Sequence, residues 1–184
     1  MIRLSVLLCL WGLSGGVGAA EYHLDLARSA LAFRFVQMGV PVTGKFRTLQ
    51  AQVQFDPARP EATQVTVVVP LASIEVGTPE GNTEAQRPAW FDAKQFPEAQ
   101  FRATQVQALG ADRYRVVGHL QLKGKTTPLE VVAQAQVTPG GLTLQSQFTL
   151  QRLALGIGTG LWADTETVAD AVQLTLTLTL VTAL

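Results

Sequence analysis

Two glycine-containing stretches have the spacing of nucleotide-binding motifs. The first, GVPVTGKF from Gly39 to Phe46, reads Gly, four residues, Gly, Lys, as a phosphate-binding loop does. Such a loop continues with Ser or Thr and with a helix whose N-terminus faces the phosphates. Here Phe46 follows the lysine, and the next residues, FRTLQAQVQF, alternate like a strand. We therefore expect no nucleotide site, and we interpret Gly39 and Gly44 as residues that allow a tight connection between two strands.

The second stretch, GTGLWA from Gly158 to Ala163, matches the pattern Gly-x-Gly-x-x-Ala of dinucleotide-binding folds. That pattern opens a strand–helix–strand unit, for which the roughly 20 residues that remain are too few. The match therefore predicts no dinucleotide site.

Side chains suited to acid–base or metal chemistry are sparse. His23 and His119 are the only histidines, and Cys9 is the only cysteine, so a structural zinc site is not expected. Asp92 and Glu98 could be read as paired carboxylates, but their position around Pro97 is typical of turn and surface residues. No Gly-x-Ser-x-Gly elbow occurs. The sequence predicts a protein that is not an enzyme and binds no metal.

The first 20 residues have the pattern of a secretory signal peptide. Arg3 precedes an apolar run from Leu4 to Leu13, which is shorter than the roughly 20 residues needed to span a bilayer. Two small-x-small cleavage sites end at Ala19 and Ala20. We expect residues 1–20 to be removed, Cys9 with them, leaving one domain over residues 21–184 in the periplasm or outside the cell. A retained membrane anchor is the alternative.

Charge gives no indication of a nucleic-acid partner. The chain has 14 Lys and Arg against 14 Asp and Glu, for a net charge of zero, and no long run of either sign. Electrostatic binding of nucleic acid requires a basic face. The sequence leaves association as a homodimer open.

The dominant hydrophobic period is two, which is typical of half-buried strands. Short turn signals, such as Asp56-Pro57 and Lys123-Gly124-Lys125, separate about nine candidate strands. Only Glu75 to Pro97 fails to alternate, and there we expect a long loop with a helical turn near Thr83 to Trp90. Regular antiparallel strands with one apolar face indicate an all-β sandwich or barrel.

Odd and even positions of a strand face opposite sides, so the position (parity) of each apolar residue predicts whether its side chain points inward. One set of apolar side chains is predicted to do so. This set could form a packed core or the wall of a lumen, and parity does not separate the two. Its members are Phe33, Phe35, Phe55, Val67, Phe101, Leu120, Val131, Phe148, Leu174 and Leu176. Met38, Phe46, Trp90 and Trp162 are candidates for the mouth or its loops.

Five short motifs, in this order, resemble the YceI-like family of periplasmic lipid-binding proteins. The resemblance extends from about Tyr22 to Leu180, nearly the whole expected mature chain. The motifs are MGVPVTGKF (Met38 to Phe46), FDP (Phe55 to Pro57), WFDAKQFP (Trp90 to Pro97), GHLQLKGKTTPL (Gly118 to Leu129) and RLALGIGTGLW (Arg152 to Trp162).

The resemblance implies an elongated antiparallel β-barrel of about eight strands, similar to lipocalins, whose lumen can hold one ligand. It implies that the inward set binds a long isoprenoid, such as a quinone tail or a prenyl phosphate, and that no other cofactor is present.

The chain departs from the family pattern at three polar positions. Gly81 to Glu84 stand where many members have Arg-Asp-x-His, Gln37 replaces a frequent histidine, and Ala154 replaces a frequent aspartate. The polar contacts that the family makes to a ligand head group are therefore not transferred to this chain. The pattern is similar to relatives encoded with membrane di-haem cytochromes b, which would favour a link to quinones. The alternative function is protein contact in the envelope, for example with a membrane cytochrome b, without lipid transport.

Overall fold

A computed structural model of the chain describes residues 20–182, so the expected signal peptide lies outside the described residues except for Ala20. The strands are β1 (Ala20–Leu24), β2 (Ala30–Gln37), β3 (Val40–Phe46), β4 (Gln50–Phe55), β5 (Gln64–Pro70), β6 (Ile74–Glu75), β7 (Glu98–Gly110), β8 (Arg113–Leu122), β9 (Lys125–Thr138), β10 (Gly141–Gln151) and β11 (Ala171–Thr182). The helices are α1 (Pro79–Ala85) and the single 3₁₀ turns η1 (Leu26–Arg28), η2 (Pro60–Ala62), η3 (Leu71–Ser73) and η4 (Gly160–Ala163). No helix among these described residues is long and apolar enough to cross a membrane.

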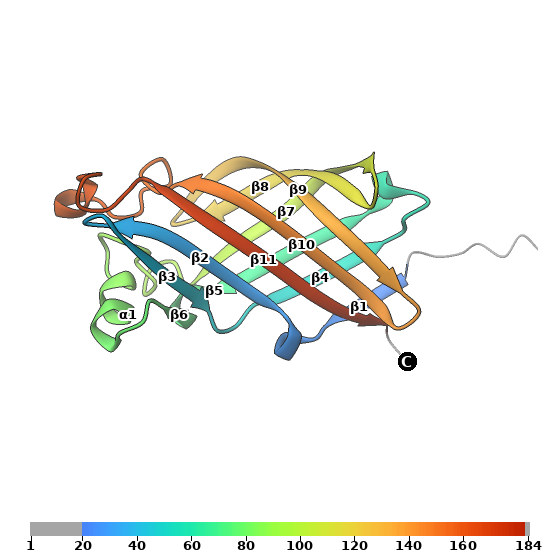
Figure 1. Cartoon of the computed structure of the whole chain (residues 1–184), viewed down its shortest axis with the longest axis horizontal. Helices are drawn as coiled ribbons and strands as arrows, with labels where there is room; N and C mark the ends of the chain where they lie inside the picture. The colour runs from blue at the N-terminus through green and yellow to red at the C-terminus, as the bar shows by residue number, and fades with distance from the viewer. Residues whose placement is uncertain (1–19, 183–184) are drawn as a thin grey trace, which may run out of the picture.

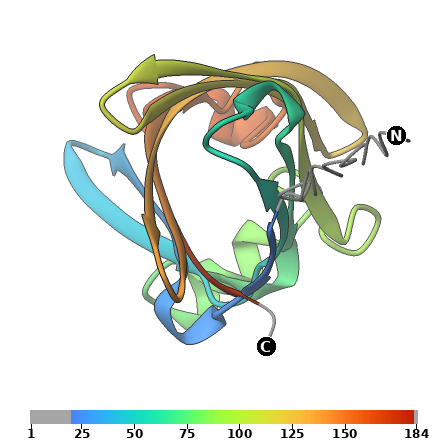
Figure 2. The ribbon, with the colours of Figure 1, turned by 90° about the vertical axis from the view of Figure 1, so that its right-hand side faces the viewer.

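The strands form one closed, elongated antiparallel barrel, which confirms the predicted fold class (Figures 1 and 2). β1 pairs with β4 while β2 pairs with β3, so β1 and β2 act as one wall strand that η1 interrupts. β3 and β4, and likewise β5 and β6, are halves of two further wall strands. With β7 to β11 these three make the eight strands, and β11 closes the wall by pairing with β10, β1 and β2.

Alternation of apolar and polar residues turns one face of each strand into the barrel. In β8, Tyr114, Val116 and Leu122 are buried, whereas His119 is exposed, as its parity predicts. Because successive side chains of a strand point to opposite faces, this pattern gives an apolar interior and a Gln- and Thr-rich outer wall.

The helix in the long loop begins earlier than predicted. We expected a helical turn near Thr83 to Trp90, but α1 spans Pro79–Ala85. The Thr78 side chain accepts a hydrogen bond from the backbone N–H of Gly81 at 3.1 Å, and a proline occupies the first turn. Both are strong N-terminal signals, so local capping rather than the charged stretch fixes where α1 begins.

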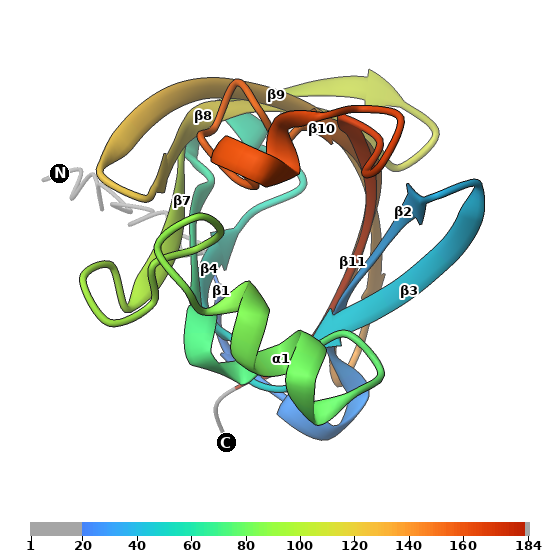
Figure 3. The same cartoon turned by 90° about the vertical axis from the view of Figure 1, so that its left-hand side faces the viewer.

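Pairing between neighbouring strands stops at the end of the barrel that carries α1 and η4 (Figure 3). We call this end the loop end. Pairing of β9 with β10 stops at Ala133 and Ser146, and β6 pairs only with β3. The segment after β10 lies against the β8–β9 turn, where the Lys123 ammonium donates to the Gly156 carbonyl at 2.8 Å. Leu155 of this segment is buried in the core. Loops, not strands, therefore complete the barrel at the loop end.

The interpretation of the two glycines in GVPVTGKF is only half correct. Gly39 lies in the β2–β3 turn with a φ of +78°, as a tight connection requires. Gly44 instead lies within β3, opposite Phe33 of β2. A side chain there would meet the Phe33 ring and the Glu75 carbonyl oxygen. Gly44 is therefore required by close packing rather than by a turn.

Gly44→Ala is expected to lower the free energy of unfolding by about 1–3 kcal/mol, because the added methyl group must displace an aromatic ring and a backbone carbonyl. Urea denaturation of the two proteins measures the difference. Gly140→Ala is the matched control, since no atom lies within 4 Å of where its Cβ would be. Equal costs for the two substitutions would contradict close packing at Gly44.

Candidate functional site: the barrel cavity

The barrel encloses a cavity of about 960 Å³. Its size lies at the upper end of the roughly 300–1,000 Å³ typical of small-molecule sites. The structure places all ten inward residues on its wall, so this part of the interior is hollow. They are Phe33, Phe35, Phe55, Val67, Phe101, Leu120, Val131, Phe148, Leu174 and Leu176. Their contact with a ligand stays a prediction.

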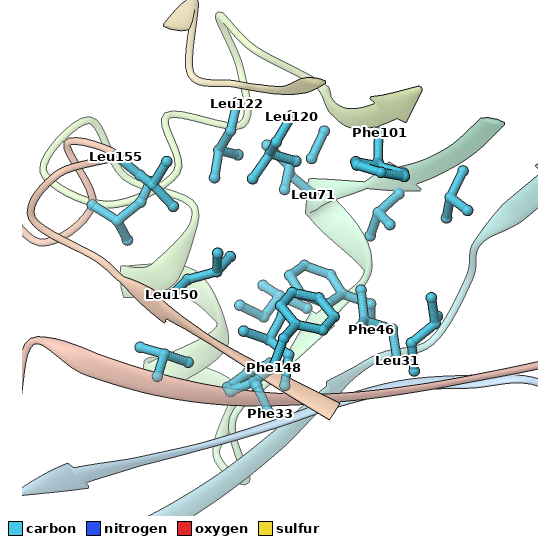
Figure 4. A pocket seen from close by; sticks show the side chains of 18 of the residues that line it. Leu31, Phe33, Phe46, Leu71, Phe101, Leu120, Leu122, Phe148, Leu150 and Leu155 are labelled. Atoms are coloured by element: carbon cyan, nitrogen blue, oxygen red, sulfur yellow. The ribbon is translucent and has the colours of Figure 1, made fainter. Parts of the chain in front are cut away.

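The wall residues come from strands on opposite sides of the barrel. Figure 4 shows Phe33 and Phe148 facing Leu120 across the open interior. Phe33 of β2 and Phe148 of β10 lie on the two strands that flank β11, and both are paired with Leu174 of β11. Such a surface offers dispersion and hydrophobic contacts along its length but few hydrogen-bonding groups.

The cavity is closed at the end where β1 meets β11. Tyr22, Leu142 and Leu180 are buried there and do not line the cavity. Phe55 and Tyr114 make an edge-on ring contact at 5.2 Å beside them. Most of the polar lining lies at the opposite, loop end, and comprises Gln37, Thr78, Glu80, Thr83, Glu84 and Arg87. A molecule with an apolar chain and a polar end therefore fits with the polar end at the loop end.

Two of the four predicted mouth residues meet at the loop end. Trp90 and Trp162 both line the cavity, and their rings lie 5.5 Å apart. The Trp162 Nε1–H donates to Glu84 Oε1 at 3.1 Å, which ties the segment of η4 to α1. The Glu84 carboxylate also pairs with Arg87 at 3.0 Å. The two tryptophans thus connect the loops that cover this end.

The other two mouth candidates lie elsewhere. Phe46 was expected at the mouth or in a loop, but it ends β3 inside the barrel and is buried, with its ring 5.7 Å from Phe33. The alternating pattern of β3 extends to residue 46, which is why its side chain points inward. Met38 does lie in a loop, the β2–β3 turn, but it is 75% exposed and does not line the cavity.

Arg152 is a buried residue that the sequence interpretation missed. Its side chain is only 3% exposed, and all five guanidinium N–H groups donate to backbone carbonyls at 2.6–3.1 Å. The acceptors are the carbonyl oxygens of Ile157, Gly158, Trp162, Val168 and Ala169. Burial lowers the pKa of Arg152 and nearby Asp170 opposes that shift, but an arginine stays charged in proteins. Arg152 therefore holds the segment from β10 to β11 in one conformation.

The glycines of GTGLWA serve this arrangement. Gly158 has a φ of +71°, and a side chain there would meet the Arg152 guanidinium and the Trp90 ring. The motif that resembles a dinucleotide fingerprint thus lets the backbone curve around a buried cation. Gly156, Gly158 and Gly160 of this loop all have positive φ. The high density of glycines after an arginine was the one signal in the sequence that could have indicated this arrangement.

Asp92 and Glu98, the two carboxylates considered as a pair, do not line the cavity. Among residues 20–182, no three His, Cys, Asp or Glu side chains gather in a group that could hold a metal ion. Asp92 lies in a turn with a φ of +50°, and Glu98 is exposed at the start of β7. What the site can do is enclose a long apolar molecule.

A closed antiparallel barrel with an apolar cavity of ligand size defines a class of small lipocalin-like β-barrels. Within that class the chain belongs to the YceI-like domain family, which matches residues 22–180. It is 28% identical over 124 residues to a UPF0312 protein of Azotobacter vinelandii, a match that covers 66% of this chain and 65% of that relative, just under two thirds.

Solved structures share the fold. BcnA of Burkholderia cenocepacia is 34% identical, with a TM-score of 0.82 over 85% of this chain and 98% of its own. A domain from Saccharophagus degradans, described as polyisoprenoid-binding and implicated in plant cell wall breakdown, has a TM-score of 0.72. It is 15% identical, over 89% of this chain and 99% of its own, so this likeness concerns the fold.

Proposed function

We propose that this protein binds or carries a long-chain isoprenoid lipid in the barrel lumen. The observation that carries the proposal is the apolar cavity of about 960 Å³, closed at one end and lined by the ten inward residues. Membership of the YceI-like family and the description of the Saccharophagus domain support the choice of an isoprenoid.

Hydrophobic burial would supply the affinity for such a ligand. Each buried CH₂ group contributes about 0.8 kcal/mol, so a chain of several isoprene units gains far more from the wall than one polar contact can add. The wall places aromatic and branched aliphatic side chains around the whole circumference. A methyl-branched chain suits this irregular surface because each branch adds dispersion contacts.

Tryptophan fluorescence offers a direct test. The chain has three tryptophans, of which Trp11 lies in the expected signal peptide, while Trp90 and Trp162 line the cavity. Titration of the mature protein with an isoprenoid quinone should quench this fluorescence saturably, with one ligand per protein. A linear, non-saturating decrease equal to that of free tryptophan would contradict binding in the lumen.

We also propose that the protein acts in the periplasm or outside the cell, because its first residues have the pattern of a cleaved export signal. N-terminal sequencing of protein isolated from its own cells should begin near Glu21, after cleavage at Ala19 or Ala20. A protein that begins at Met1 would contradict export with cleavage.

One feature favours the alternative function through protein contact, for example with a membrane cytochrome b. Met38 and Val40 at the β2–β3 turn are 75% and 62% exposed, and Leu161 in η4 is 96% exposed. Exposed apolar groups of this kind mark interaction surfaces when they gather. A stable complex whose formation does not depend on bound lipid, and which Leu161→Ser disrupts, would favour this function over carriage.

A further inference from the structure

The most exposed apolar side chains of the described residues gather at the loop end. Leu161 of η4 is 96% exposed, Met38 of the β2–β3 turn 75% and Val40 of β3 62%, whereas the next most exposed, Val137, is at 49%. The β2–β3 turn and η4 lie at the same end of the long axis of the barrel (Figure 1). We call Met38, Val40 and Leu161 the apolar rim.

Two backbone hydrogen bonds attach the β2–β3 hairpin to the segment that carries Leu161. The Met38 N–H donates to the Thr167 carbonyl at 2.9 Å, and the Ala169 N–H donates to the Val36 carbonyl at 2.9 Å. Thr167 and Ala169 follow η4 within a few residues. The parts of the apolar rim are therefore carried by connected backbone, so they form one surface rather than unrelated exposed side chains.

The inner face of the β2–β3 hairpin connects the apolar rim to the cavity. Val40 and Val42 lie on the same face of β3, because residues two apart in a strand point the same way. Val42 lines the cavity and is paired with Phe35 of β2, which lines it as well. The ring of Phe35 stacks with that of Phe33, with centroids 6.3 Å apart. An apolar surface therefore extends from the exposed Val40 into the lumen.

The cavity reaches the surface beside this hairpin. In the described part of the chain, β6 pairs with β3 only at Lys45 and Phe46, so the half of β3 near the turn has no strand on that side. Thr78, Pro79 and Glu80, at the start of α1, are exposed and also line the cavity. The opening therefore lies between α1 and the hairpin, which both face the viewer in Figure 3, next to the apolar rim.

The charges beside the apolar rim are negative. Residues 36–40 and 159–169 contain no lysine or arginine, but they contain Asp164 and Glu166, which are both exposed. Hydrogen bonds from the Thr167 hydroxyl and the Glu166 N–H lower the pKa of Asp164, so this carboxylate is charged at neutral pH. Anionic bilayers attract clusters of lysine and arginine. The rim therefore suits a bilayer of zwitterionic lipids rather than an anionic one.

We propose that the apolar rim docks on the surface of a zwitterionic lipid bilayer, with the opening of the cavity toward the bilayer. Apolar side chains that enter the bilayer interface bind in proportion to the apolar area they bury. A bilayer is favoured over a protein partner because the rim is continuous with the lumen, so the surface that covers the rim is also the source of the ligand. This inference rests on the proposed function and extends it by naming the surface from which the isoprenoid is taken.

Partition of the ligand-free mature protein into vesicles tests the proposal. Two kinds of vesicle are compared: phosphatidylcholine alone, and phosphatidylcholine partly replaced by phosphatidylglycerol. We expect the protein to float with vesicles of phosphatidylcholine alone and to bind no more tightly when phosphatidylglycerol is present. The triple variant Met38→Asn, Val40→Thr, Leu161→Gln should lower the partition coefficient at least about tenfold, or about 1.4 kcal/mol. Asparagine is chosen because it tolerates the φ of +49° at residue 38.

The matched control changes three exposed apolar positions outside the loop end: Leu109→Gln, Val132→Thr and Val137→Thr. It should alter the partition coefficient less than about twofold, because these side chains do not face the bilayer. Leu161→Gln alone should lower the coefficient about threefold or more. With Leu161 at 96% exposed, this variant keeps the fold even where the triple variant does not.

Three results would overturn the proposal. The first is no partition of the wild type into phosphatidylcholine vesicles, and the second is an equal loss in the rim variant and in the control. The third is association with native membranes that protease treatment of those membranes abolishes, without partition into protein-free vesicles, which would assign the rim to a protein partner.

Uptake of a short-chain isoprenoid quinone from solution, without vesicles, separates this inference from the proposed function. Wild type and rim variant should take up the quinone equally, because the rim residues do not line the cavity. Normal uptake without partition into vesicles would refute the docking and leave the proposed function intact. Failure of the wild type to take up the quinone would refute the proposed function, and this inference with it.

Discussion

Replacement of Leu174 by tryptophan is expected to leave the barrel folded but to lower its affinity for an isoprenoid at least about tenfold, or about 1.4 kcal/mol. Leu174 lines the cavity from β11, opposite Phe33 and Phe148 on the two neighbouring strands. In a solid core the larger indole would cost about 1–3 kcal/mol through overpacking. In a hollow lumen the ring enters free space and blocks the path of the chain instead.

Two measurements on ligand-free protein separate these cases: the melting temperature and the uptake of isoprenoid. Ligand must be absent from the melting comparison, because binding to the native state raises apparent stability by RT ln(1 + [L]/Kd). Thr175→Trp, one residue along β11 on the exposed face, is the control and should preserve uptake. A large drop in the melting temperature of ligand-free Leu174→Trp would mean that residue 174 is packed core.

Arg152→Met is expected to be the most destabilising single substitution considered, lowering the free energy of unfolding by about 3–5 kcal/mol. Methionine retains much of the apolar stem but leaves five carbonyl oxygens without the guanidinium that now binds them. Each bond to a charged donor contributes about 1.5–3 kcal/mol, and partial access of water to the loosened loop limits the total. The loss should extend to ligand binding, because the same segment carries Trp162.

Urea denaturation measures this loss of stability, with the m-value of the variant equal to that of the wild type. Arg152→Lys should recover only part of the stability, since an ammonium has three donors in place of five. Arg28→Ala is the surface control, because the Arg28–Asp25 pair is exposed and such pairs contribute about 0–1 kcal/mol. If Arg152→Met and Arg28→Ala cost the same, Arg152 does not hold the loop together.

The strands and the inward residues could be predicted because burial of one face imposes a period of two on the sequence. The prediction works where a strand is regular, as in β8, where Tyr114, Val116 and Leu122 all point inward. It fails at irregularities. In β7 the register shifts between Ala103 and Gln105, so that Val106 is buried where strict alternation would place residue 105.

The loop end could not be predicted in the same way. The partners of Arg152 are backbone carbonyls, which any residue type supplies, so no pattern of side chains reveals them. The bond from Trp162 to Glu84 joins residues 78 positions apart. Parity also could not show whether the interior is hollow, because that depends on how far opposite walls stand apart. Capping residues before α1 were present in the sequence and would have placed the helix correctly.

The central claim is that the lumen holds an isoprenoid lipid in the cell. The most direct measurement is purification of the protein from its own cells without added detergent, organic extraction, and mass spectrometry of the extract against a mock purification. We predict recovery of an isoprenoid, close to one molecule per protein, and its loss from Leu174→Trp purified in parallel. Repeated recovery of folded wild-type protein with no isoprenoid above the mock level would contradict the account.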